Sequence, residues 1–309
     1  MTTARLPAGI RVLERGWLSA NNILLIDEEY GTPAVLVDTG YVSHAEQTVS
    51  LVAHALGGRP LGRIVNTHLH SDHCGGNAAL QAAHRCLIAI PPGEAEAVRA
   101  WDAARLSYEA TGQRCARFDY DELLQPGSTH RWAGRSWQVH AAPGHDPHAV
   151  MLLEPESGTL VSGDALWENG FGVVFPEIEG EAALDDVEAS LDVIERLRPR
   201  LIIPGHGSAF TDITGALTRA RRRLAQFRHD PLAHGWYASK VLVKFHLLEV
   251  RREGLGDLCA WMDQTPYLHL IHQRYFPRHA WARWQEELLE ALFRAGALLR
   301  DGQDVLDAG

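Results

Sequence analysis

The sequence is poor in cysteine and in long apolar runs. It contains four cysteines among 309 residues, and none of them forms a Cys-x-x-Cys pair. This scarcity argues against a disulfide framework and against a zinc site built from thiolates, and it favours a reducing cytoplasm. No apolar run reaches 18 residues, and the N-terminal stretch MTTARLPAGIRVLERG lacks the apolar segment of a secretory signal. We therefore expect a cytoplasmic protein with no membrane partner.

Basic residues are also scarce over most of the chain. The formal net charge is −10, which disfavours nucleic acid as a partner. Of the chain's 29 Lys and Arg and 39 Asp and Glu, residues 211–309 hold 14 and 12, so the acidic excess lies in the rest of the chain. This shift predicts two domains, 1–210 and 211–309. The basic run RARRRL at 219–224 predicts the solvent-exposed face of a helix.

Short apolar runs alternate with helical patterns in the first domain. Each run is rich in branched apolar residues, is bounded by Gly or Pro, and ends at an Asp or a His, which predicts buried strands. The runs are PAVLVDTG, GRIVNTHLH, SWQVHAAPGH, GTLVSGD and PRLIIPGH. Residues 184–197 have apolar positions at helical spacing, and we expect 93–110 to be helical as well. In a layered fold such strand ends can share one edge, so distant polar residues can meet.

The second domain is predicted to be mainly helical. A helix can begin at a cap formed by Asp212 or Thr214, and another follows Pro231. An apolar stripe from Trp281 to Leu292 ends at Gly296. The segment GALLRDGQDVL predicts a small hairpin with its turn at Asp301-Gly302. Helices followed by a hairpin resemble a winged helix.

The densest group of candidate ligands lies in THLHSDHCGG, residues 67–76. His68 and His70 are two positions apart, so an extended backbone points both side chains to one side. The chain must then turn, which lets Asp72 and His73 face a neighbouring point. Imidazole and carboxylate together suit zinc, manganese or iron, and the lack of nearby cysteine ligands argues against a closed structural zinc site. The stretch therefore predicts a metal site.

Together the motifs resemble those of the metallo-β-lactamase-fold hydrolases, close in style to the glyoxalase II and lactonase branches. The resemblance covers residues 10–210 and rests on five motifs in order: DTG at 38–40, THLHSDHCGG at 67–76, PGHD at 143–146, SGDALW at 162–167 and PGHG at 204–207. It implies an α/β fold, namely an αββα sandwich with a mainly helical C-terminal extension. It also implies a two-metal centre with one ion on His68, His70 and His145, the other on Asp72, His73 and His206, and Asp164 bridging both.

The same resemblance implies a reaction. Two divalent ions, with zinc favoured and iron or manganese as alternatives, would make a shared hydroxide available to attack an ester, thioester or lactone of a small-molecule substrate. Asp72 would also orient the nucleophile or carry its proton, and Asp38 would support the metal loop from behind. We expect Cys74 to be a small buried residue. His148 departs from the pattern, because many relatives have Gly at this position, and it either shapes the pocket or fills space.

Three alternatives stay open. A single-iron sulfur dioxygenase of the same fold would use only His68, His145 and Asp164. A nucleic-acid phosphodiesterase shares the metal motif but is disfavoured by the acidic charge, and a DNA-binding metal sensor would use the second domain. The oligomeric state, a homodimer included, is also open.

The second domain is expected to cap the metal edge and to shape the substrate pocket. Its many large aromatic residues, from Phe227 to Trp284, cannot all turn inward in a unit of this size, so some should pack on the first domain or on a second subunit. In the first domain, Trp167, Phe171 and Phe175 are expected either in the core or in the pocket wall.

Overall fold

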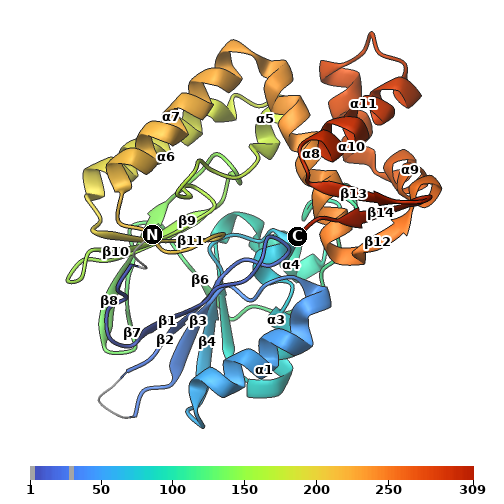
Figure 1. Ribbon diagram of the computed structural model, residues 1–309. Coiled ribbons are helices and arrows are strands. Elements are labelled where there is room, and N and C mark those ends of the chain that lie inside the picture. The colour runs from blue at the N-terminus through green and yellow to red at the C-terminus, as the bar shows by residue number, and fades with distance from the viewer. Residues whose placement is uncertain (1–3, 28–30) are drawn as a thin grey trace.

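The computed structural model describes residues 4–27 and 31–309, and its first two-thirds form four layers, two sheets between two layers of helices (Figure 1). The first sheet has the order β1 (Ile10–Leu13), β2 (Asn22–Leu25), β3 (Ala34–Val37), β4 (Leu61–Val65), β5 (Leu87–Ile90) and β6 (Glu122–Leu123). Its first three strands are antiparallel, and β3 to β6 are parallel. The second sheet has the order β11 (Leu201–Pro204), β10 (Thr159–Gly163), β9 (Val150–Glu154), β8 (Arg135–Ala141) and β7 (Thr129–Trp132).

Strand alternation explains how the layers are held together. In β3, Val35 and Val37 belong to the cluster between the two sheets, which also contains Trp137 of β8. Ala34 and Leu36, on the opposite face of the same strand, belong to the cluster beneath the outer helices. Because both faces are covered, β3 is an unbroken apolar run, as the sequence predicts.

Helices cover the outer face of each sheet. On the first sheet lie α1 (Ala45–Leu56), α3 (Asn77–His84) and α4 (Ala95–Ala100), and on the second lie α6 (Ala183–Leu197) and α7 (Ile213–His229). Shorter helical segments occupy the connections: η1 (Val42–His44), α2 (Ser71–Cys74), η2 (Pro92–Glu94) and α5 (Phe175–Glu179). The fold class, the five predicted strands and the helix at 184–197 are confirmed.

The prediction of a helix over 93–110 is wrong in its second half. The helix α4 ends at Ala100 because Trp101 adopts a left-handed conformation with φ 53°, and residues 101–112 form turns. The Trp101 ring packs edge-on against Phe118 with a centroid distance of 5.6 Å. Packing against a distant residue thus ends a helix that local spacing would continue.

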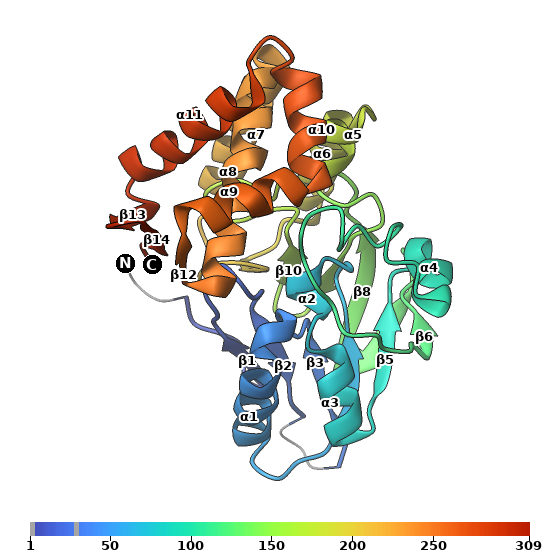
Figure 2. The ribbon, with the colours of Figure 1, turned by 90° about the vertical axis from the view of Figure 1, so that its right-hand side faces the viewer.

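The C-terminal part is mainly helical, as expected, and lies beside one edge of the sandwich (Figure 2). It contains α8 (Pro231–Val250), α9 (Leu255–Gln264), α10 (Pro266–Tyr275) and α11 (Trp281–Arg294), with a sheet of order β12 (Arg252–Gly254), β14 (Asp304–Asp307) and β13 (Leu298–Asp301). The predicted hairpin and the helix start are confirmed, since β13 pairs with β14 and Asp212 accepts a hydrogen bond from the Gly215 N–H. The turn lies one residue later than predicted, at 302–303, because Asp301 still pairs with Asp304. Within the described residues, no helix is long and apolar enough to cross a bilayer.

Residues 211–309 contribute to two separate clusters of apolar side chains. Leu217 and Leu224 of α7 pack with α6 in the core of the second sheet. The elements from α8 to β14 form another core, which holds most of the large aromatic residues and also buries Val173 and Ile178 of the preceding chain. Most of these aromatic side chains pack in this core, and some also contact the first domain as expected, since the Tyr267 ring lies 5.4 Å from that of Phe175 and the Phe227 ring 6.2 Å from that of Phe171. The boundary at residue 210 stays a prediction.

Candidate metal centre

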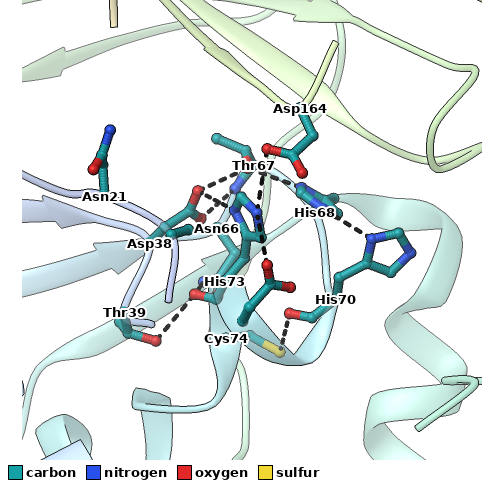
Figure 3. Close-up of polar contacts among 12 residues, drawn as sticks. Asn21, Asp38, Thr39, Asn66, Thr67, His68, His70, His73, Cys74 and Asp164 are labelled. Carbon is teal, nitrogen blue, oxygen red and sulfur yellow. Dashed lines mark hydrogen bonds and ion pairs between the residues drawn. The ribbon is translucent and has the colours of Figure 1, made fainter. Parts of the chain in front are cut away.

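Polar residues from several strand ends meet at one edge of the sandwich (Figure 3). His68, His70, Asp72 and His73 follow β4, His145 follows β8, Asp164 follows β10 and His206 follows β11. The structure brings all seven predicted side chains together in three overlapping groups: His68, His70 and His145; His68, His73 and Asp164; Asp72, His73 and His206. In each group the potential ligand atoms lie within 4.8 Å of one another.

The first group consists of three imidazoles. His70 Nδ1 lies 3.1 Å from His68 Nε2 and 2.8 Å from His145 Nε2. The remaining nitrogens of two rings are held from behind, since His68 Nδ1 lies 3.1 Å from Thr67 Oγ1 and His145 Nδ1 donates to the Val173 carbonyl. These outer contacts set which nitrogen of each ring faces the centre.

The group of Asp72, His73 and His206 combines a carboxylate with two imidazoles. Asp72 Oδ2 lies 3.0 Å from His206 Nε2 and 3.8 Å from His73 Nε2. His73 Nε2 is buried and has no hydrogen-bond partner in the structure. A buried ring nitrogen without a partner is costly, and a metal ion at this point would satisfy it. The donor set therefore fits a divalent cation.

Asp164 lies between the two groups. Its Oδ1 is 3.4 Å from His73 Nε2, and its Oδ2 is 3.5 Å from His145 Nε2 and 3.8 Å from His206 Nε2. Gly205 makes room for this carboxylate, because a Cβ at that position would lie 2.1 Å from Asp164 Oδ1. Close packing against Asp164 thus explains the first glycine of the PGHG motif, Gly205.

Asp38 supports His73 from the side opposite the centre (Figure 3). The buried carboxylate accepts hydrogen bonds from the Thr67 N–H at 2.9 Å, the Thr67 hydroxyl at 2.8 Å and His73 Nδ1 at 2.8 Å. Asp38 itself has a φ of 56°, a left-handed conformation that Asp tolerates better than most residues. Its contact with His73 is the supporting interaction that the sequence resemblance implies.

The electrostatics of the site suit metal binding. Burial and the neighbouring imidazoles hold the pKa of His68 well below its usual range, and burial together with His145 lowers the pKa of His70 to about 4. Burial alone would raise the pKa of Asp164, but His73 and His206 outweigh it and lower that pKa. Burial alone would lower the pKa of His73, but Asp164, Asp38 and Asp72 outweigh it and raise that pKa well above its usual range. A metal ion at this point would take the place of the proton that His73 otherwise holds between the carboxylates, since ligation requires a neutral imidazole.

Two residues that the sequence analysis did not identify complete the site. The Asn21 side-chain amide donates to the carbonyls of Pro204 at 3.0 Å and Gly207 at 2.7 Å, and so holds the loop that carries His206. The Trp17 ring stacks on His206 with a centroid distance of 5.3 Å. Both residues come from the connection between β1 and β2, which carries no recognisable motif.

A cavity of about 380 Å³ lies over the centre, within the range of small-molecule sites. His70, Asp72, His145, Asp164 and His206 line its metal end. Much of its wall is aromatic or aliphatic, and the residues after position 210 that line it are Arg223, Tyr237, Val241, Leu242 and Phe245. The C-terminal part thus contributes to the wall of this cavity, and its role in shaping a substrate pocket stays a prediction.

The structure shows where the side chains lie whose roles the sequence left open. Trp167 and Phe175 line the cavity, and Trp167 Nε1 donates to Asp164 Oδ1 at 3.1 Å, whereas Phe171 is buried in the core. Cys74 is fully buried as expected, and burial raises the pKa of its thiol. His148 is exposed and lies outside this cavity.

Comparison with known proteins agrees with the geometry. Residues 16–206 match the family described as the metallo-beta-lactamase superfamily. A hydroxyacylglutathione hydrolase from Synechococcus sp. (strain JA-3-3Ab) is 32% identical over 188 residues, which cover 61% of this chain and 64% of that relative. The chain thus matches less than two-thirds of the relative's length.

Solved structures share the fold over nearly the whole chain. A metallo-beta-lactamase family protein from Thermus thermophilus superposes with a TM-score of 0.58 at 21% identity, covering 98% of this chain and 100% of that one. A beta-lactamase domain protein from Burkholderia ambifaria gives 0.60 at 22% identity, covering 97% and 91%. The arrangement of sandwich and C-terminal part therefore recurs in other proteins.

Proposed function

The chain belongs to the metallo-β-lactamase superfamily, and on this premise we propose that it is a hydrolase with a binuclear metal centre. His68, His70 and His145 would hold one ion, and Asp72, His73 and His206 the other. The observation that carries the proposal is the place of Asp164, whose carboxylate lies within 3.8 Å of imidazoles from both groups. A single carboxylate in contact with two ligand sets is suited to bridging two ions.

Bound divalent ions would supply a water of lowered pKa and would polarise a carbonyl oxygen. The chain's own residues position what reacts there. Asp72 lines the cavity and would orient the attacking water or take its proton. Trp167 holds one oxygen of Asp164 through its indole N–H, and Asp38 fixes the His73 ring, so both carboxylate and imidazole are held in place before substrate arrives.

We propose an ester, a thioester or a lactone as the bond that is cleaved. The hydroxyacylglutathione hydrolases among the relatives support a thioester. The cavity supports a small molecule, since its volume of about 380 Å³ is at the lower end of ligand sites. Zinc is the favoured metal because the ligands are imidazoles and carboxylates, which also admit iron and manganese.

The test combines metal analysis with a substrate screen. Protein purified without chelator would be assayed on thioesters, lactones and phosphodiesters, and on a persulfide with oxygen uptake recorded. We expect hydrolysis of at least one of the first two classes, its loss with chelator and its return with metal. Cleavage of phosphodiesters alone would instead favour the nuclease alternative, and oxygen consumption with one iron per chain would favour the dioxygenase.

A further inference from the structure

The basic run at 219–224 has one member that differs from the others. On α7, Arg219 donates to the Glu168 carbonyl at 2.8 Å, and Arg221 pairs with two acidic side chains of α6. Arg222 is exposed to solvent. These three fit the solvated helix face that the sequence predicts. Arg223 differs from all three because it lines the cavity over the metal centre.

The Arg223 guanidinium is held by packing on two sides. It lies over the ring of Tyr237 at 5.3 Å from the ring centroid, and Nη1 donates to the Phe171 carbonyl at 3.4 Å. On the other side it lies against Gly170, where an added Cβ would be 2.4 Å from Nη1. These contacts fix the position of the group and use few of its five donors.

Among the residues that the structure describes, no acidic side chain is paired directly with Arg223, although Asp72, Asp164 and Glu168 line the same cavity. Within the described part of the chain, Arg223 is also the one Lys or Arg in the cavity lining. A guanidinium stays protonated at all accessible pH values, so one that lines a cavity without an ion-pair partner among the described residues favours binding of an anion.

We propose that Arg223 binds a carboxylate on the non-reacting part of the substrate. The inference rests on the proposed hydrolase function, since it concerns which esters or thioesters enter the cavity. A carboxylate fits better than a phosphate monoester, because one guanidinium balances one charge and Glu168 lies in the same cavity. Val241, Leu242 and Phe245 share the wall, so the substrate combines this carboxylate with an apolar segment.

Matched thioesters test the proposal and locate the carboxylate. In the first arm, linear dicarboxylic acids are joined through one carboxyl to a neutral thiol and compared with monocarboxylic acids of equal length. In the second arm, one apolar acyl group is joined to a thiol with or without a carboxylate. Wild-type protein should favour the carboxylate-bearing member of one arm by about 10- to 100-fold in kcat/KM, the range of a charge-assisted hydrogen bond.

Variants of adjacent arginines show whether Arg223 is responsible. Arg223→Gln should lose the preference, so that its kcat/KM for the carboxylate-bearing member falls to that for the neutral member. Arg222→Gln, the exposed control, should keep the preference. Arg223→Lys, which keeps the charge but loses the planar donor pair, should retain part of it.

Two results would overturn the proposal. One is equal activity of the wild type on charged and neutral members in both arms, which needs no variant and so holds even if Arg223→Gln does not fold. The other is an unchanged preference in Arg223→Gln. If the wild type hydrolyses no ester, thioester or lactone at all, the proposed function has failed instead, and this outcome is distinct from hydrolysis without preference.

Discussion

His73 Nδ1 lies 2.8 Å from Asp38 Oδ2, and this contact ties a ligand-bearing turn to the end of β3. The same carboxylate accepts both the N–H and the hydroxyl of Thr67. Three hydrogen bonds from the metal loop thus converge on one buried side chain. The geometry makes Asp38 a positioning residue, which acts on the centre through His73.

Replacing Asp38 by Asn tests this positioning role. Asn tolerates the left-handed backbone at this position, but its uncharged amide cannot hold all three donors as the carboxylate does. We expect metal affinity to fall about 10- to 100-fold, the usual cost of losing such a partner, with the fold retained. Metal titration followed by competition with a chelator measures the change, and unchanged affinity with a native circular dichroism spectrum would count against the role.

Asp164 and His148 should respond very differently to truncation. Asp164→Ala removes the carboxylate between both ligand groups, so metal loading and hydrolysis should both collapse. His148→Ala removes an exposed side chain outside the cavity and should have little effect. Metal content and kcat of the two variants decide the matter. If His148→Ala abolished activity while Asp164→Ala stayed within about threefold, a change of about 0.7 kcal/mol in barrier, the ligand assignment would be wrong.

The C-terminal wall of the cavity can be tested at Phe245. Phe245→Ala should raise KM several-fold with a smaller change in kcat, because the residue lines the cavity but is not among the metal-binding groups. Leu232→Ala, on the same helix but 48% exposed, is the matched control. Identical steady-state constants for both variants and the wild type would show that this wall does not contact substrate.

Truncation after Ser208 is a less selective test of the same idea. It would remove Leu217 and Leu224, which α7 contributes to the core of the second sheet. We therefore expect the truncated chain to lose stability as well as its pocket wall, which thermal unfolding would reveal. A truncated protein that stays folded, binds metal and keeps its kcat and KM would contradict the role of residues 211–309 in the pocket.

Stability should fall in mild acid because of His234. This histidine is buried against Phe227, and neither of its nitrogens has a hydrogen-bond partner among the residues that the structure describes. Burial lowers its pKa to about 4. Below the unfolded value of about 6.5 the unfolded chain takes up a proton that the folded chain does not. The stabilisation that the protein gains from burying neutral His234 is therefore fully present above that pH. It is lost as the pH falls to about 4, the pKa in the folded state.

The pKa of His234 differs between the folded and unfolded chains, and this difference corresponds to a loss of about 3 kcal/mol in the free energy of unfolding between the two pKa values. His234→Leu should flatten the pH dependence of the free energy of unfolding over this interval, relative to the wild type. Because metal loss also destabilises the protein in acid, the comparison is made between the two metal-free proteins. Parallel curves for both would refute the assignment to His234.

Much of the fold and the site could be predicted from sequence because the signals are local. Each of the five predicted strands carries its own apolar run and leads to a ligand such as Asp164 or, in β3, to the supporting residue Asp38. The helix after Pro92 was predicted too long, because a contact between Trp101 and Phe118 overrides local spacing.

The missed residues have no local signal. Asn21 bonds to a carbonyl 186 positions away, and nothing in the sequence around it indicates that contact. Arg223 lies in a run of similar residues, and only its position in the fold, against Gly170 and in the cavity wall, separates it from the other arginines of the run. Such roles depend on tertiary contacts that neither spacing nor composition encodes.

The metal stoichiometry of the purified protein tests the central proposal most directly. Elemental analysis of protein prepared without chelator should give close to two divalent ions per chain, because His68, His70, Asp72, His73, His145, Asp164 and His206 form two ligand groups around one shared carboxylate. A fully loaded protein with a single ion per chain and an ordered but empty second site would contradict the account.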